Sequence, residues 1–286
     1  MMRGAKARRG YNKPVPPPAM PYSDTEFSVL LWALGVFVAA LAMHLGQGWV
    51  RMAQRGPTLR HEWRALLLAA TVLGLGLTSA VELGMQAQAL SFPVGYRWLA
   101  VAALLPAAVL ACAPAAVAAV FGARTVALFG SGALLALAAL ALQAGWVWAA
   151  GFRPGVLWRV ELVAAAAVLA VVGLALAQWI AFAPAFHDSP RRSLWRIAAA
   201  VLAALTLMAG LQLMSLAAGL HTQGASSHNG ELPGTVASLV CGVIVPLALV
   251  ALMLDLWLRR HQRRQRGHGD FNPMQRRKRR HKMRTL

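Results

Sequence analysis

Long apolar stretches alternate with short polar segments over most of this chain. Seven of the stretches reach about 20 residues, the length that a helix needs to cross the hydrocarbon core of a bilayer. Backbone groups in lipid must be hydrogen-bonded within their own segment, so each stretch is expected to be an α-helix. The expected spans are Phe27–Val50, Ala65–Ala87, Trp98–Phe121, Val126–Ala150, Leu157–Phe182, Trp195–Leu220 and Thr235–Trp257.

The pattern therefore predicts an all-α, polytopic integral membrane protein with seven transmembrane helices. It divides the chain into a Pro-rich basic N-terminal tail (residues 1–26), a membrane domain (27–258) and a basic, disordered tail (259–286). The spans leave no room for a soluble catalytic domain. We found no P-loop, paired carboxylates or nucleophile–base pair, so the sequence favours a protein that is not an enzyme.

Composition and charge agree with this class. Hydrophobic residues make up 58% of the chain and charged residues only 13%, unlike an ordinary soluble domain. Lys and Arg number 28 against 9 Asp and Glu, and most of the excess lies outside the spans. Nucleic acid could be a partner by charge alone, but positively charged cytoplasmic loops are the simpler explanation. The basic tail is then expected to contact anionic lipids.

The loop charges also predict the topology. Basic residues follow the first, third and fifth spans and fill the C-terminal tail, which places that tail in the cytoplasm and the N-terminus outside. Five basic residues in the N-terminal tail conflict with this orientation, although they lie far from the first span. The start methionine could also be misassigned. The bias of the loops outweighs the conflict.

A pattern recurs on the even-numbered spans, about 60–70 residues apart. Small and polar residues cluster near the outer end of the second span (Gly74–Met85), the fourth (Ala141–Trp146) and the sixth (Met208–Ala218). Small residues at such spacing allow helices to approach closely. The seven spans are therefore expected to form three two-helix repeats followed by a final helix.

This arrangement resembles the MHYT domain family of bacterial membrane sensors. The resemblance is strongest at Gly74–Met85 and in the following Phe92–Tyr96 loop. Ala209–Ala218 aligns without gaps to the family's motif, and Leu252–Arg260 is similar to its last helix. The resemblance implies a sensory role in the bacterial inner membrane. This chain has no enzymatic output domain after the spans, so a signal would need a separate partner or the basic tail.

The resemblance also implies a bound metal, copper, held by the His and Met side chains of the motif. In this chain the motif histidine positions hold Val81, Leu142 and Gln212, or Gln143 if the middle copy is shifted by one. Valine and leucine cannot ligate a metal, and an amide oxygen is a poor copper ligand. The resemblance therefore predicts the architecture better than the ligand.

Glu82 is the one acid near the interior of a predicted span, which by default indicates a functional site. It could bind a cation, relay a proton or pair with a glutamine of another span, or it could simply reach water at the outer interface. Glutamines could equally form interhelical hydrogen bonds while methionines fill gaps. The candidate ligand-binding residues in this outer layer are Glu82, Met85, Gln143, Gln212 and Met214.

Three functions remain open at this point. The first is a non-enzymatic sensory or ligand-binding module. The second is an ion or small-solute transporter that uses Glu82, which ranks lower because polar residues are expected to stop at one layer, with no track to the cytoplasm. The third is a membrane assembly or scaffold protein without a ligand.

Overall fold

The computed structural model describes residues 27–54, 59–88, 90, 92–120, 125–153, 156–183, 191–218, 226–227 and 230–269. The predicted N-terminal tail and residues 270–286 lie outside the described residues. The long helices are α1 (Val29–Gln54), α2 (Leu59–Gln86), α3 (Trp98–Val120), α4 (Thr125–Ala150), α5 (Val160–Phe182), α7 (Arg192–Ala217) and α9 (Val245–Gly269). Short elements are β1 (Gly95–Tyr96), β2 (Phe152–Arg153), β3 (Ser226–Ser227), β4 (Leu232–Pro233), α8 (Gly234–Leu239) and the π-helix η1 (Val240–Ile244).

The prediction of an all-α membrane protein with seven spans is confirmed. Seven helical segments within the described residues are long and apolar enough to cross a membrane. The seventh consists of α8, η1 and α9, which follow one another without a break. Each predicted span coincides with one of these segments, with ends that differ by several residues, as at α2, which begins at Leu59 instead of Ala65.

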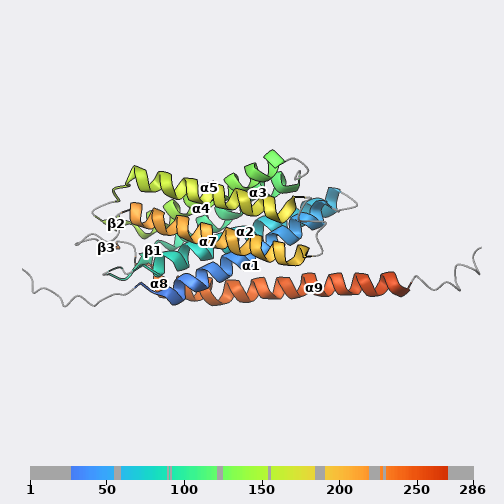
Figure 1. Ribbon diagram of the computed structural model, residues 1–286. Coiled ribbons are helices and arrows are strands. Elements are labelled where there is room, and N and C mark those ends of the chain that lie inside the picture. Colours follow the sequence, from blue (N-terminus) through green and yellow to red (C-terminus); the bar gives the residue numbers. More distant parts are fainter. Residues whose placement is uncertain are drawn as a thin grey trace, which may run out of the picture.

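Six of the long helices form a closed ring. Each of α1, α2, α3, α4, α5 and α7 contacts the next, and α7 contacts α1. Helix α9 lies along the outside of this ring (Figure 1), where it contacts α1 and α2. Only 22% of the most apolar window of the seventh span is buried, so this span presents most of its surface to lipid.

The boundary predicted at Leu258 lies inside a helix. The last helix, α9, continues into the basic segment as far as Gly269 (Figure 1), so the first part of the predicted disordered tail is helical. Arg and Gln are good helix formers, and the run from Arg259 to Gly267 contains no proline or glycine before its end. The helix end predicted from charge composition, at Leu258, is therefore too early in the sequence.

Small residues bring the ring helices into close contact. A Cβ on Gly74 would meet the backbone of α3 at Val109, and one on Gly132 would overlap the backbone of α5 at Ala175. A Cβ on Gly76 would overlap Ala42 of α1. Without a hydrophobic driving force between helices in lipid, such close packing supplies much of the association energy.

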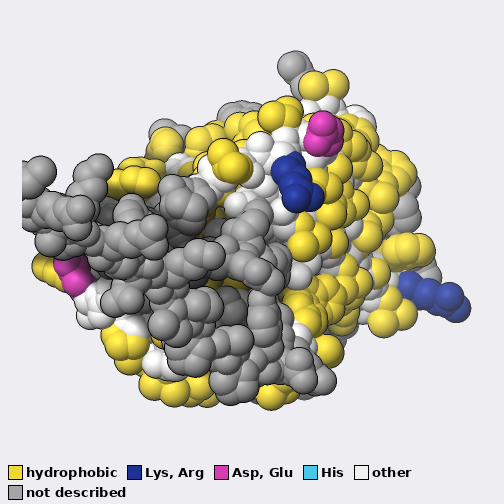
Figure 2. All heavy atoms as spheres, turned by 90° about the vertical axis from the view of Figure 1, so that its left-hand side faces the viewer, with side chains coloured by type: hydrophobic (Ala, Val, Ile, Leu, Met, Phe, Trp, Pro, Cys, Tyr) yellow, Lys and Arg dark blue, Asp and Glu magenta, His cyan; other side chains and the backbone are white. Residues whose placement is uncertain are grey.

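Two short antiparallel ribbons close one end of the bundle, which we call the strand end. Strand β1 pairs with β4, and β2 pairs with β3, so the segment before α8 is joined to two other loops. Gly151 precedes β2 with a φ of 60°, a left-handed conformation that glycine adopts without strain. Seen from the strand end, the visible side chains of the described residues are mainly hydrophobic (Figure 2).

Buried polar side chains lie at both ends of the bundle, contrary to the expectation of a single layer. Near the strand end these include Glu82, while Gln47, Ser131 and Gln178 are buried near the opposite end. These three line one small cavity of about 10 Å³, enough for about one water molecule. Span-by-span inspection missed this second layer because its members come from three helices that meet only in the folded bundle.

Candidate functional site

The Glu82 carboxyl group lies at the strand end, near the C-terminal end of α2, and is completely buried. Its Oε1 atom accepts a hydrogen bond from Gln86 Nε2 at 3.1 Å and a long one from Ser238 Oγ at 3.5 Å. The same Gln86 nitrogen lies 3.3 Å from the Tyr96 hydroxyl. Within the described residues, Glu82 Oε2 makes no hydrogen bond. The Glu82 side chain is therefore buried in the bundle and does not reach water at the outer interface.

The seventh span contributes to this site at an irregular turn. Ser238 is the second-last residue of α8, and Cys241 lies in the π-helix η1 directly after it. Cys241 is buried and lies close enough to the Glu82 carboxyl of α2 to feel its charge. Single π-helical turns within α-helices are frequent at functional sites because the extra residue redirects side chains. Here the turn accompanies the approach of two polar side chains to Glu82.

Tyr96 joins the loop between α2 and α3 to this cluster. It belongs to β1, is fully buried, and packs edge-to-face against Trp146 of α4, with ring centroids 4.7 Å apart. Burial, reinforced by the charge of the nearby Glu82 carboxylate, holds the pKa of the Tyr96 phenol well above its usual value. The phenol is therefore a stable hydrogen-bonding group at neutral pH.

Gln143 and Gln212 do not contact Glu82. Gln143 Nε2 donates to Ser215 Oγ at 3.0 Å, which links α4 to α7. Gln212 Oε1 accepts a hydrogen bond of 2.7 Å from Gln88 Nε2, which links α7 to the end of α2. Both glutamines thus form hydrogen bonds between helices or to the segment after a helix, and neither pairs with Glu82.

The two predicted methionines also lie apart from each other. Met85 is buried in the main hydrophobic core, three residues after Glu82 in sequence. Met214 belongs to a separate small cluster with Leu140 and Ala166, and its side chain lines a surface pocket. The five predicted site residues therefore occupy several environments and do not form one ligand shell.

This arrangement does not fit a copper centre. Within the described residues, no three His, Cys, Asp or Glu side chains come together in a group that could bind a metal. The positions of the expected histidines hold Val81 and Leu142, which are buried and cannot ligate, and Gln212, whose amide oxygen is hydrogen-bonded to Gln88. Copper prefers imidazole, thiolate and thioether ligands, and these three positions supply none of them.

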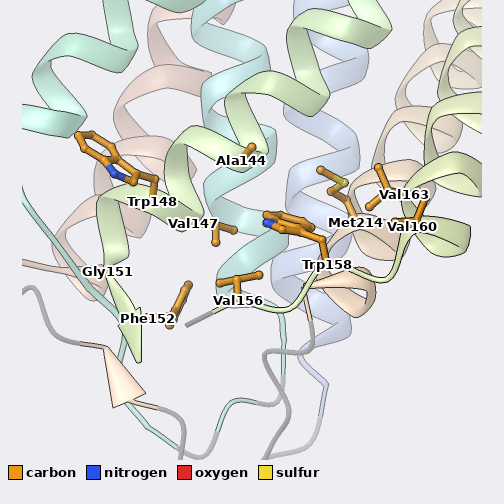
Figure 3. Close-up of a pocket in the computed structure, with 10 residues that line it drawn as sticks. All are labelled: Ala144, Val147, Trp148, Gly151, Phe152, Val156, Trp158, Val160, Val163 and Met214. Carbon is orange, nitrogen blue, oxygen red and sulfur yellow. The ribbon is translucent and has the colours of Figure 1, made fainter. Parts of the chain in front are cut away.

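A larger pocket of about 480 Å³ opens at the strand end among α4, α5 and α7 (Figure 3). In Figure 3 the ring of Trp158 lies between Val147 of α4 and Met214 of α7. The lining residues within the described chain are apolar or glycine: Ala144, Val147, Trp148, Gly151, Phe152, Val156, Trp158, Val160, Val163 and Met214.

Sequence reasoning missed Tyr96, Ser238 and Gln88 as parts of this polar layer. Tyr96 and Ser238 reach Glu82 only because β1 pairs with β4, a contact between segments more than 130 residues apart. The positions of Gln86 and Cys241 in their spans predict the same depth as Glu82, and both lie near its carboxyl group in the structure. No spacing along the chain indicated which of these residues would touch.

Comparisons of the chain with protein-family models, with curated proteins and with solved structures found no match.

Proposed function

We propose that this protein is a non-enzymatic sensory module of the membrane that binds a small cation at Glu82, either a proton or a monovalent metal ion. The observation that carries the proposal is the complete burial of the Glu82 carboxyl among neutral groups. A buried carboxylate without a compensating charge is strongly unfavourable. A bound cation removes this penalty, so occupancy of the site would follow the cation concentration outside the bundle.

The surroundings of Glu82 support this charge argument. It accepts hydrogen bonds from Gln86 and Ser238, and Gln86 also contacts the Tyr96 hydroxyl; all three groups are neutral at pH 7. Among the described residues, Cys241 is the other titratable group close to it. Arg97 follows Tyr96 directly, but its side chain is exposed. The carboxylate and hydroxyl oxygens that converge here are hard donors, which suit a proton or a hard metal ion rather than copper.

The distribution of positive charge supports an outward-facing site. Basic loops follow the first, third and fifth spans, at the end of the bundle opposite the strand end. Under the positive-inside rule the strand end faces outwards and the C-terminal basic segment lies in the cytoplasm. Glu82 lies about one turn before the end of α2, so a cation would have only a short distance to travel from the outer surface.

The seventh span offers a route for the signal. Its helical segments run without a break from Gly234, beside the site, to Gly269 in the basic segment. Ser238 contacts Glu82 just before the π-helix, so a change in the charge of Glu82 alters a hydrogen bond at an irregular turn of this span. Displacement of the π-helical turn would then reach the cytoplasmic partner or lipid that the basic segment contacts.

Difference infrared spectroscopy of the full chain in nanodiscs tests this function. Shifts of pH or of Na⁺, K⁺ or Li⁺ concentration are expected to change the carboxyl bands of the wild type, and the ion that does so identifies the cation. Glu82→Gln should abolish the change. Glu161→Gln is the matched control, because Glu161 is exposed at the start of α5. Equal spectra for the wild type and Glu82→Gln would overturn the proposal.

The second buried polar layer favours a transporter as the alternative. Gln47, Ser131 and Gln178 lie between Glu82 and the opposite end of the bundle, so polar groups occur on both halves of the path that an ion would follow. Proteoliposomes distinguish the two functions. Cation flux that Glu82→Gln abolishes would favour the transporter, whereas cation binding without flux would favour the sensor.

A further inference from the structure

The apolar pocket at the strand end lies beside the Glu82 site without sharing a residue with it. Its walls are the last turns of α4, the first turns of α5, and the connecting segment that includes Phe152 and Trp158. Met214 of α7 forms part of the remaining wall. A volume of about 480 Å³ falls within the usual range of pockets that hold small molecules.

The lining chemistry selects a hydrocarbon ligand. Among the described residues, the side chains that line the pocket are aliphatic, aromatic or thioether, and none is a carboxylate, an amide or a basic group (Figure 3). A polar ligand would lose its hydrogen bonds to water and find few replacements, since among the lining side chains only the indole N–H groups of Trp148 and Trp158 can donate. Met214 is unbranched and flexible, so it can adapt to an irregular chain.

The position of the pocket in the bundle indicates where such a ligand would come from. Trp148 and Val160 at its rim are 70% and 76% exposed, on helices that cross the membrane, so the pocket is continuous with the lipid-facing surface. Ala144 lies six residues before the end of α4, about 9 Å along the helix. The pocket therefore extends from the interface, where tryptophans concentrate, into the upper hydrocarbon layer.

From this geometry we propose that the pocket among α4, α5 and α7 binds one long hydrocarbon chain of a membrane lipid, with the lipid's head group at the strand end. Acyl chains of phospholipids and isoprenoid chains share this chemistry. Dispersion contacts with Trp158, Phe152 and Val163 would retain the chain when the surrounding bilayer is removed. The pocket would then hold a bound lipid rather than one that exchanges freely with the bilayer.

The full chain, purified in mild detergent, is extracted with organic solvent, and the retained lipid per protein is quantified by mass spectrometry. About one lipid per chain is expected for the wild type, and its identity separates phospholipid from isoprenoid. Ala144→Phe fills the pocket and should lower retention at least tenfold. Leu137→Phe is the control, because Leu137 lies on the exposed face of the same helix and does not line the pocket.

Val163→Phe provides the same test from the α5 wall if Ala144→Phe fails to fold, as judged by helical circular dichroism and gel filtration. Loss of the lipid in either pocket-filling variant, with retention in Leu137→Phe, supports the proposal. Equal lipid content in pocket-filling and control variants would overturn it, as would a wild-type protein that retains no lipid. The result does not depend on whether Glu82 binds a cation.

Discussion

Tyr96 packs edge-to-face against Trp146, with ring centroids 4.7 Å apart and an angle of 82° between the ring planes. Both side chains are buried, and they come from different parts of the chain, the loop after α2 and the last turns of α4. This contact holds the phenol of Tyr96 beside the Glu82 cluster. The aromatic pair thereby links the position of a loop to the geometry of a buried acid.

A double-mutant cycle measures that link. Tyr96→Leu and Trp146→Leu should each destabilise the bundle, and the double variant should lose less than the sum, with a coupling of about 0.5–1.5 kcal/mol. Thermal unfolding in detergent provides the measurement. Tyr96→Leu combined with Trp49→Leu is the control pair, because Trp49 lies near the opposite end of α1, and additive effects are expected there. Additivity in the Tyr96–Trp146 pair would contradict the finding.

The ionisation of Tyr96 predicts a loss of stability in alkali. The folded protein holds the phenol pKa well above the value near 10 of the unfolded chain, because the phenol is buried beside Glu82. Above about pH 10 the unfolded chain releases this proton while the folded chain retains it, so the stability that is fully present at lower pH falls as the pH rises. Tyr96→Phe keeps the ring and removes the proton. Its melting temperature should therefore fall less steeply above pH 10 than that of the wild type, and identical slopes would exclude this assignment.

Gly234 determines how closely α8 approaches the Glu82 cluster. A Cβ at this position would overlap Gln86 Nε2 and the carbonyl oxygen of Val94. Gly234→Ala should therefore displace the Gln86 side chain and lower stability by about 1–3 kcal/mol, the usual cost of forcing extra atoms into a packed site. Gly230→Ala is the matched control, since a Cβ there would meet no atom of the described chain within 4 Å. Equal melting temperatures for the two variants would refute this account.

Substitution of Gln47 tests whether its buried amide in the second polar layer stabilises the bundle. Among the described residues neither polar atom of its buried amide has a hydrogen-bond partner, and an unsatisfied buried group costs about 1–3 kcal/mol. Gln47→Leu removes the amide and should raise the melting temperature. Gln54→Leu, which removes a hydrogen bond of 3.0 Å to the carbonyl oxygen of Ala119, should lower it or leave it unchanged. A marked fall for Gln47→Leu would instead show that the amide is hydrogen-bonded, for example to a water molecule in the cavity that it lines.

Metal analysis tests whether the purified protein binds copper. After the purified protein is loaded with Cu(I) and Cu(II) and dialysed, much less than one copper per chain is expected, because Val81 and Leu142 supply no ligand. Met85→Leu should leave that amount unchanged. One tightly held copper that Met85→Leu or Glu82→Gln removes would restore the metal-sensor interpretation.

The sequence by itself determined the membrane helices of this protein. Apolar runs of this length have one stable arrangement in lipid, so the seven spans could be predicted without knowledge of their neighbours. It also identified Glu82, since an acid in such a run is rare and costly. The prediction that the last helix ends before the basic segment was wrong, because Arg and Gln are good helix formers and α9 continues to Gly269.

The tertiary structure decided which side chains meet. Gln143 and Gln212 share a depth with Glu82 but bond to Ser215 and Gln88, because the rotation of each helix directs them to other neighbours. Tyr96 and Ser238 reach the carboxyl group through the pairing of β1 with β4, which joins distant segments. Depth in a membrane follows from position along one helix, whereas contact depends on the rotation and pairing of several, and only the folded bundle fixes these.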